Sequence, residues 1–238
     1  MVINQPSGLD ARFWAIVVAA GKGQRMHADR PKQYLPLAGR TVIEHSLNAF
    51  LQLRLIERIV VVIAPQDRHW SSLAISQHPK IITAIGGCTR ADSSRQGLRA
   101  LTPLAHPHDW IVEHDGVRPC LRTDELARFI RQLREHAVGG LAAYPVQDTL
   151  KRSNASQGVL NTLTRQHLWH AATPQMFRYH LLSSALTNAK TQTQLITDSA
   201  MAIELAGYQP QLIPCAKTNI KLTEVQDLVL ARCVLECL

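Results

Sequence analysis

Glycines and basic residues follow the first apolar run of the chain, a combination suited to binding phosphate. Gly21 and Gly23 are followed by Arg25 and Lys32. Glycine lets backbone N–H groups approach an anion closely, and two nearby cations suit the charge that develops at an attacked phosphorus. The spacing is not that of a P-loop, and Met26 replaces the third glycine of a dinucleotide fingerprint. For the glycines alone, an ordinary turn with solvated basic neighbours remains the alternative.

A second candidate for chemistry is Asp115, which follows the expected strand at 110–113 and precedes Arg118 and Pro119. A single carboxylate at the end of a strand suits Mg²⁺, which keeps waters and substrate phosphates as its other ligands. The alternative is a carboxylate that caps the next turn. The Arg-Pro pair that follows favours the functional interpretation.

Other kinds of chemistry find little support. The eleven histidines show no tight ligand spacing, so no zinc site is indicated, and no G-x-S-x-G elbow of a serine hydrolase is present. The five cysteines are odd in number and form no CxxC pair, which predicts neither a disulfide framework nor a zinc knuckle. We expect a reducing compartment, the cytoplasm.

The charge balance is basic, with 26 Lys and Arg against 18 Asp and Glu and a formal net charge of +8. The basic residues are scattered and aromatic residues are few, so nucleic-acid binding is not indicated. Scattered positive charge suits an enzyme with phosphorylated substrates, although a merely solvated basic surface remains the alternative. No apolar stretch reaches the eighteen or so residues of a membrane span, so no membrane association is expected.

Apolar runs alternate with helical patterns along most of the chain. We expect strands at 13–20, 59–64, 81–85, 110–113, 140–146 and 211–213. We expect helices at 41–51, 67–76, 92–101, from about 124, at 176–186, at 197–206 and from 223. The first of these helices opens with the capping box Thr41–Glu44, and the last opens with Thr223–Gln226. Such alternation predicts an α/β fold of doubly wound type, with a mostly parallel sheet. Residues 1–12 are expected to be a flexible leader without signal-peptide character, and 13–238 a single domain.

The segment at about 147–172 breaks this rhythm. It contains no long helical pattern, and Ser153, Asn154, Ser156 and Gly158 mark a turn, which predicts a hairpin-like protruding β-arm. In the rest of the fold, ligands should bind beyond the carboxyl ends of the parallel strands. The candidate site is therefore formed by the loops at 21–32, 86–93 and 115–118.

A set of motifs in fixed order makes the interpretation more specific. They are Ala19-Ala20-Gly21-x-Gly23-x-Arg25-Met26 with Pro31-Lys32, Gly86-Gly87 with Arg90, Asp92 and Ser93, His114-Asp115-Gly116-Val117-Arg118-Pro119, 145–151, Arg165-x-x-Leu168-Trp169, Thr173-Pro174-Gln175, Ile196-Thr197-Asp198 and Asn219-Ile220-Lys221. The first resembles the signature loop of nucleotidyltransferases. The whole set, spanning about 13–230, resembles the 2-C-methyl-D-erythritol 4-phosphate cytidylyltransferase family.

This resemblance implies a Rossmann-like nucleotidyltransferase fold and a Mg²⁺-dependent transfer of a cytidylyl group from CTP to methylerythritol phosphate, in non-mevalonate isoprenoid biosynthesis. It also implies roles for individual residues. Arg25, Lys32, Arg165 and Lys221 would be catalytic; Ala19, Ala20, Gly21, Gly23, Gly87, Arg90 and Ser93 would bind the nucleotide; Arg118, Thr149, Thr173 and Thr197 would bind the acceptor phosphate; and Asp115 would hold the metal.

Further expectations follow from the resemblance. His114 is not expected to act as a base, because a phosphate nucleophile needs no deprotonation at neutral pH. Cys88 departs from the family pattern and puts nearby contacts to the base or ribose in doubt. The arm implies a homodimer with shared active sites, in which Thr149 and Arg165 reach the partner's acceptor phosphate. The alternatives are a ribitol-5-phosphate cytidylyltransferase and a non-catalytic nucleotide-binding protein on the same fold.

Overall fold

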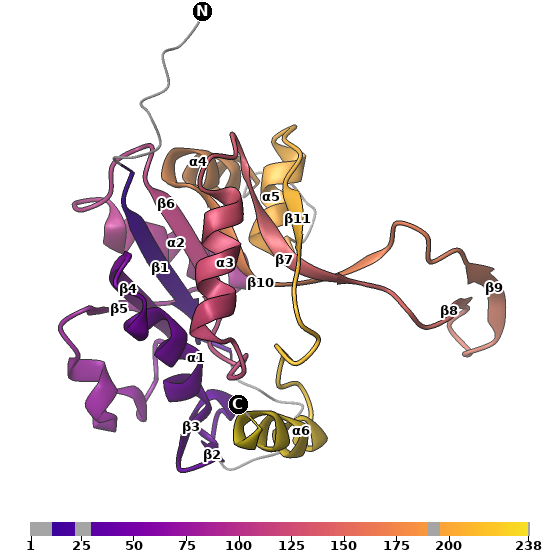
Figure 1. The fold of residues 1–238 in the computed structure, drawn as a ribbon, viewed down its shortest axis with the longest axis horizontal. Helices are drawn as coiled ribbons and strands as arrows, with labels where there is room; N and C mark the ends of the chain where they lie inside the picture. The colour runs from indigo at the N-terminus through magenta and orange to yellow at the C-terminus, as the bar shows by residue number, and fades with distance from the viewer. Residues whose placement is uncertain (1–10, 22–29, 190–195, 238) are drawn as a thin grey trace, which may run out of the picture.

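A seven-stranded sheet forms the centre of the protein (Figure 1). The structure, a computed structural model, describes residues 11–21, 30–189 and 196–237. From one edge to the other the strand order is β11–β7–β10–β6–β1–β4–β5. In chain order the strands are β1 (Phe13–Val18), β4 (Ile56–Ile63), β5 (Ile81–Ile85), β6 (Trp110–Asp115), β7 (Gly139–Pro145), β10 (Trp169–Arg178) and β11 (Gln211–Pro214). All neighbours are parallel except the two pairs that β10 forms, which confirms the mostly parallel sheet.

Helices cover both faces of this sheet, as a doubly wound fold requires (Figure 1). On one face lie α1 (Val42–Gln52) and α3 (Thr123–Leu133), and on the other lie α2 (Arg90–Leu101), α4 (Tyr179–Ala189) and α5 (Ser199–Leu205). The unbroken apolar run of β1 supplies both cores, because Ala15 and Val17 face one and Trp14 and Ile16 face the other. None of the helices in the described ranges has the length and apolar composition that a bilayer span requires.

The end of the chain packs against the loop that follows β1. There, a short 3-10 turn η2 (Lys32–Tyr34) leads into a small hairpin of β2 (Pro36–Leu37) and β3 (Arg40–Thr41), where only a loop was expected. The last helix, α6 (Val225–Glu236), joins this hairpin in a third cluster that includes Leu37, Leu222 and Ala231. This packing holds the C-terminal segment next to the β1 loop.

The expected arm is confirmed as a two-stranded antiparallel hairpin that projects from the body (Figure 1). It consists of β8 (Leu150–Ser153) and β9 (Val159–Leu163). Its expected end at 172 is wrong, because Trp169 already pairs with Pro145 in the central sheet. The arm therefore ends near residue 168.

The helix expected at 176–186 is wrong at its start. Met176 and Phe177 are fully buried in β10, which lies between β6 and β7, and α4 begins only at Tyr179. A short apolar run is ambiguous between a buried strand and a buried helix. Here the two flanking strands decide in favour of the strand.

The helix starts were predicted with mixed success. The capping box of α1 is confirmed, since the Thr41 N–H donates to Glu44 Oε2 at 2.7 Å. The box expected at 223–226 is wrong by one residue: Glu224 is the cap of α6, and its N–H donates to Asp227 Oδ2 at 2.8 Å. A carboxylate at the third helical position accepts this N–H more strongly than a neutral amide would.

Two further helices differ from expectation. The helix expected at 67–76 is instead two 3-10 turns, η3 (Trp70–Ser72) and η4 (Ala74–Gln77). The Asp67 carboxylate accepts the N–H groups of His69 and Trp70, each at 2.9 Å, and this local pairing replaces a helical ladder. On the other face of the sheet, α2 begins at Arg90, two residues earlier than the expected start at 92, because Thr89 is its cap.

Candidate functional site

A cavity of about 460 Å³ opens at the carboxyl ends of β1 and β6, where ligands of parallel sheets bind. Its walls come from the β1 loop, the loop that enters α2, the end of β6 and the segment before α6. The expected site residues that line it are Ala19, Ala20, Gly21, Lys32, Gly87, Arg90, Ser93, Asp115 and Lys221. The described residues of the three loops predicted from the sequence thus meet in one place.

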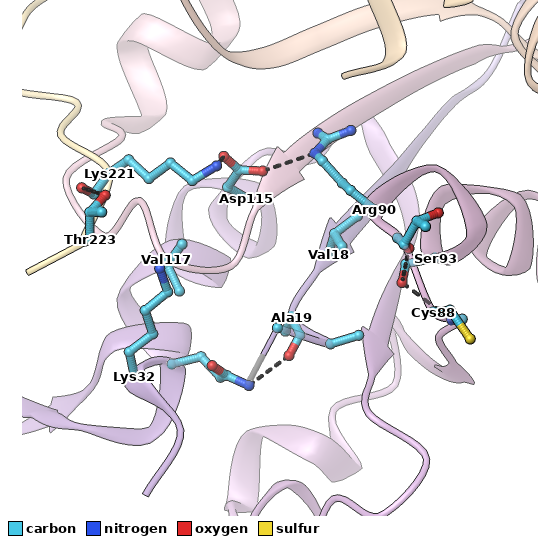
Figure 2. Close-up of a pocket in the computed structure, with 15 residues that line it drawn as sticks. Val18, Ala19, Lys32, Cys88, Arg90, Ser93, Asp115, Val117, Lys221 and Thr223 are labelled. Atoms are coloured by element: carbon cyan, nitrogen blue, oxygen red, sulfur yellow. Dashed lines mark hydrogen bonds and ion pairs between the residues drawn. The ribbon is translucent and has the colours of Figure 1, made fainter. Parts of the chain in front are cut away.

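Three cations surround the carboxylate of Asp115 at the end of β6. Lys221 Nζ lies 2.9 Å from Oδ2, Arg118 Nε 3.4 Å from Oδ2 and Arg90 Nε 3.4 Å from Oδ1. Figure 2 shows the Lys221 and Arg90 side chains approaching Asp115 from two sides. Burial alone would raise the pKa of Asp115, but Arg90, Lys221 and Arg118 together hold it well below its usual range. Asp115 is therefore ionised near pH 7, in a cavity suited to further anions.

Two expected acceptor-site residues lie behind Asp115 instead of lining the cavity. Arg118 is buried, and besides Asp115 it contacts Asn219, whose carbonyl accepts from its Nη1 at 2.7 Å. The buried hydroxyl of Thr173 accepts the Asp115 N–H at 3.2 Å. In this structure both residues therefore fix the position of the carboxylate.

His114 is fully buried between the same groups. Its Nδ1 lies 2.9 Å from Thr173 Oγ1, and its Nε2 lies 3.1 Å from the Arg118 carbonyl. Burial lowers the pKa of His114 to about 4. The ring is therefore neutral near pH 7.

The loop that enters α2 is shaped by close contacts. A Cβ on Gly87 would lie 2.3 Å from Asp92 Cβ, so only glycine fits there. The Ser93 hydroxyl accepts the Gly87 N–H at 3.3 Å and holds the loop against the helix. Asp92 forms the capping box of α2 with Thr89. This fold brings the positive end of the helix dipole to the cavity, where it favours a bound anion.

Cys88 is exposed at the rim of this loop, and it lines the cavity (Figure 2). The position expected to depart from the family pattern therefore falls within the candidate nucleotide site.

Lys32 and its neighbour Gln33 connect the β1 loop to the rest of the site. Lys32 Nζ donates to the Leu222 carbonyl at 2.7 Å, next to Lys221 in the chain. Gln33 lines the cavity, and its Nε2 donates to the Ala19 carbonyl at 2.7 Å. Sequence reasoning gave Gln33 no role, although it follows Lys32 directly. It also missed Val18, Val117, Thr89 and Thr223, which complete the lining.

The carboxylate of Asp115 is the kind of ligand that Mg²⁺ takes, and in this structure basic side chains occupy both of its oxygens. Asp115 offers an ionised oxygen ligand to the cavity, and an ion of this kind takes waters and substrate phosphates as its remaining ligands. Across the described ranges, no group of three or more His, Cys, Asp or Glu side chains forms a protein-only metal cage.

The other expected site residues lie outside the cavity lining. Thr149 and Arg165 are exposed in the arm, just before β8 and just after β9, and the Arg165 guanidinium donates to the Gln147 carbonyl. Thr197 is exposed just before α5. The expected roles of Gly23 and Arg25 concern positions outside the described residues.

Comparisons with known proteins agree on one family. A family model for 2-C-methyl-D-erythritol 4-phosphate cytidylyltransferase matches residues 13–237. A curated relative of that name from Vibrio vulnificus (strain CMCP6) is 44% identical over 217 residues, covering 91% of this chain and 92% of the relative. One from Pseudomonas paraeruginosa is 45% identical over 218 residues, covering 91% and 93%.

Solved structures of the same kind are similar in fold. The Francisella tularensis enzyme of that name has a TM-score of 0.82 and 32% identity, with 94% of this chain and all of that chain (100%) covered. A crystal structure described as 4-diphosphocytidyl-2C-methyl-D-erythritol synthase has a TM-score of 0.83 and 37% identity, with 95% and 100% covered.

Proposed function

The chain belongs to the 2-C-methyl-D-erythritol 4-phosphate cytidylyltransferase family, and we propose that it catalyses the reaction for which this family is named. It transfers a cytidylyl group from CTP to methylerythritol phosphate, giving 4-diphosphocytidyl-2-C-methyl-D-erythritol and pyrophosphate in non-mevalonate isoprenoid biosynthesis. The observation that supports this most is the meeting of Lys32, Asp115 and Lys221 in one cavity. A non-catalytic nucleotide-binding protein would have no need of this set.

The reaction is an in-line substitution at phosphorus. A phosphate oxygen of the acceptor attacks the α-phosphorus of CTP, the bond from that phosphorus to the bridging oxygen breaks, and pyrophosphate leaves. The acceptor phosphate is already ionised at neutral pH, so the protein need not remove a proton. Its contribution is to position the substrates and to stabilise the charge on the phosphoryl oxygens.

Residues in and around the cavity divide this work. Lys32 stabilises the charge at the α-phosphorus, and Arg25 is proposed to act with it. The backbone at Gly21 and Gly23 holds the outer phosphates, while Ala19, Ala20, Gly87, Arg90 and Ser93 surround the cytosine and ribose. Asp115 would hold Mg²⁺, which would neutralise triphosphate charge. Lys221, whose Nζ lies 2.9 Å from Asp115, orients the acceptor, and Thr197 is proposed to contact the acceptor phosphate. Arg118 and Thr173 act through Asp115, which they hold in place.

A homodimer with shared sites completes the proposal. Thr149 and Arg165 are exposed on an arm that projects from its own body (Figure 1). On the same arm Val159 and Leu160 are 64% and 62% exposed, although an isolated two-stranded arm is only marginally stable in water. Packing against a partner would cover these side chains and place Thr149 and Arg165 at the partner's acceptor phosphate. In a two-fold dimer the two arms exchange reciprocally.

The cytoplasm is the proposed location. None of the five cysteines forms a disulfide, and proteins of reducing compartments usually lack disulfides.

Nucleotide choice and metal dependence test the proposed function. We expect pyrophosphate release from CTP with methylerythritol phosphate, much slower release from UTP, ATP or GTP, and loss of activity when Mg²⁺ is chelated and its return on re-addition. Pyrophosphate is measured with a coupled assay, and reactions without acceptor serve as the control. A preference for another nucleotide would contradict the assignment.

A further inference from the structure

Two motif residues, Gln175 and Asp198, have no part in the cavity described above. Gln175 lies on β10 and is 1% exposed. In the strand register it lies opposite Glu113 on β6, which is fully buried. Asp198 is the cap of α5. Buried polar groups are costly unless they are hydrogen-bonded, so the partners of these side chains indicate what they do.

Gln175 attaches the first turn of α5 to the sheet. Its Nε2 donates to Asp198 Oδ2 at 2.8 Å, and its Oε1 accepts the Ala200 N–H at 3.0 Å. Asp198 in turn accepts the Met201 N–H at 2.9 Å through Oδ1. Both ends of one amide are therefore used to hold one helix end, immediately after Thr197.

Glu113 makes a second attachment from the neighbouring strand. Its Oε2 accepts the hydroxyl of Ser199, the first residue of α5, and both side chains are fully buried. Side chains alternate along a strand, so Glu113 faces the same side of the sheet as Asp115, two residues further along β6. The helix end is thus attached to the strand that carries the metal-site carboxylate.

Arg90, which lines the cavity, lies within electrostatic range of this helix end. It is ion-paired to Asp115, and the negative charges of Glu113 and Asp198 also act on it. Its Nη2 and the Oε1 of Glu113 are buried without a hydrogen-bond partner in the part of the chain that the structure describes. Thr197 therefore precedes a helix end that lies within the electrostatic reach of the cavity's own arginine.

We propose that Gln175 and Glu113 are positioning residues, which fix the start of α5 so that Thr197 holds the acceptor phosphate at a set place relative to Asp115. The inference rests on the proposed function, in which Thr197 contacts the acceptor. The helix would remain folded without these attachments, because Ala202 and Ile203 still pack in the core. Their loss should therefore affect the acceptor more than CTP.

The test compares KM values for the two substrates. Gln175→Met keeps the volume but removes both hydrogen bonds, and we expect the KM for methylerythritol phosphate to rise about tenfold while the KM for CTP changes by less than about twofold. Glu113→Ala should behave in the same way. Glu113→Gln retains an oxygen that accepts from Ser199, so it should restore a nearly normal acceptor KM.

Asp109→Asn is the matched control. Asp109 is also a buried carboxylate, 3% exposed, and it accepts from Trp14 Nε1 at 2.9 Å just before the opposite end of β6. It should lower stability without a selective change in acceptor KM. Equal rises in both KM values for Gln175→Met, or the same pattern in Asp109→Asn, would overturn the proposal.

Amide hydrogen exchange gives a measurement that does not depend on activity. In Gln175→Met the amides at the start of α5, including Ala200 and Met201, should exchange faster, while α4 stays protected. Unchanged exchange at α5 would overturn the proposal even if the enzyme is active. If the wild-type protein transfers no cytidylyl group, the proposed function fails, and the exchange result still decides whether these residues fix the helix.

Discussion

Lys32→Ala is expected to lower kcat by at least about a hundredfold while CTP still binds, because charge on the transferring phosphoryl group grows mainly in the transition state. Lys32 lines the cavity, and its ammonium is held at 2.7 Å from the Leu222 carbonyl, beside Lys221. A fixed cation of this kind stabilises the transition state without reorganisation. Steady-state kinetics with CTP and methylerythritol phosphate measure the effect.

Lys80→Ala provides the matched control for this variant. Lys80 also donates to backbone carbonyls, at 2.7 Å to Ile56 and 3.3 Å to Leu53, but it precedes β5 at the opposite end of the sheet from the cavity. Its loss should leave kcat nearly unchanged. A Lys32→Ala enzyme with near-normal kcat and a raised KM for CTP would show that Lys32 only binds the nucleotide.

Mixed dimers of two inactive variants are expected to regain activity. Lys32→Ala and Arg165→Ala should each be almost inactive alone. When equal amounts are refolded together, half of the dimers are mixed, and each mixed dimer has one site with both residues intact. Activity should therefore return to about a quarter of the wild-type value. If Lys32 and Arg165 serve a site from the same chain, no mixed site is complete and activity stays at background.

A reciprocal mixture gives an independent check of this result. Wild-type chains refolded with the double variant Lys32→Ala/Arg165→Ala should show about a quarter of full activity if sites are shared, and about half if they are not. Arg152→Ala, an exposed arginine on β8 of the same arm, controls for general damage to the arm. It should not lower activity in either mixture.

Most of the sheet could be predicted because its strands are unbroken apolar runs. Residues 81–85 form β5 as expected, and the turn of the arm lies where its residues indicated, with the Gly158 N–H donating to Asn154 Oδ1 at 2.7 Å. These signals are local in the sequence. The capping box at Thr41 was readable for the same reason.

The missed features depend on contacts between distant segments. β10 contains His170, Pro174 and Gln175 and has no clear alternation, and it becomes a strand because β6 and β7 offer hydrogen-bonding edges on both sides. Likewise, the burial of Gln33 depends on the η2 turn that brings its amide to the Ala19 carbonyl. A propensity pattern contains no information about such pairings.

In the candidate site, too, local features were predictable and contacts between distant segments were not. The three loops were predictable, because parallel strands bring their carboxyl ends to one edge of the sheet. The sequence did not reveal that Arg118 and Thr173 support Asp115 from behind, since this depends on the path of Asn219 and β10. Nor could it show that Gln175 and Asp198, which belong to two separate motifs, contact each other.

Acceptor choice tests the central claim most directly. Wild-type protein, CTP and Mg²⁺ are incubated in parallel with methylerythritol phosphate and with ribitol 5-phosphate, and the pyrophosphate and the cytidine diphosphate ester formed are measured by ³¹P NMR. We expect stoichiometric pyrophosphate and 4-diphosphocytidyl-2-C-methyl-D-erythritol from the first acceptor, with little product from the second. Product from ribitol 5-phosphate alone, or from neither acceptor, would contradict the proposed function.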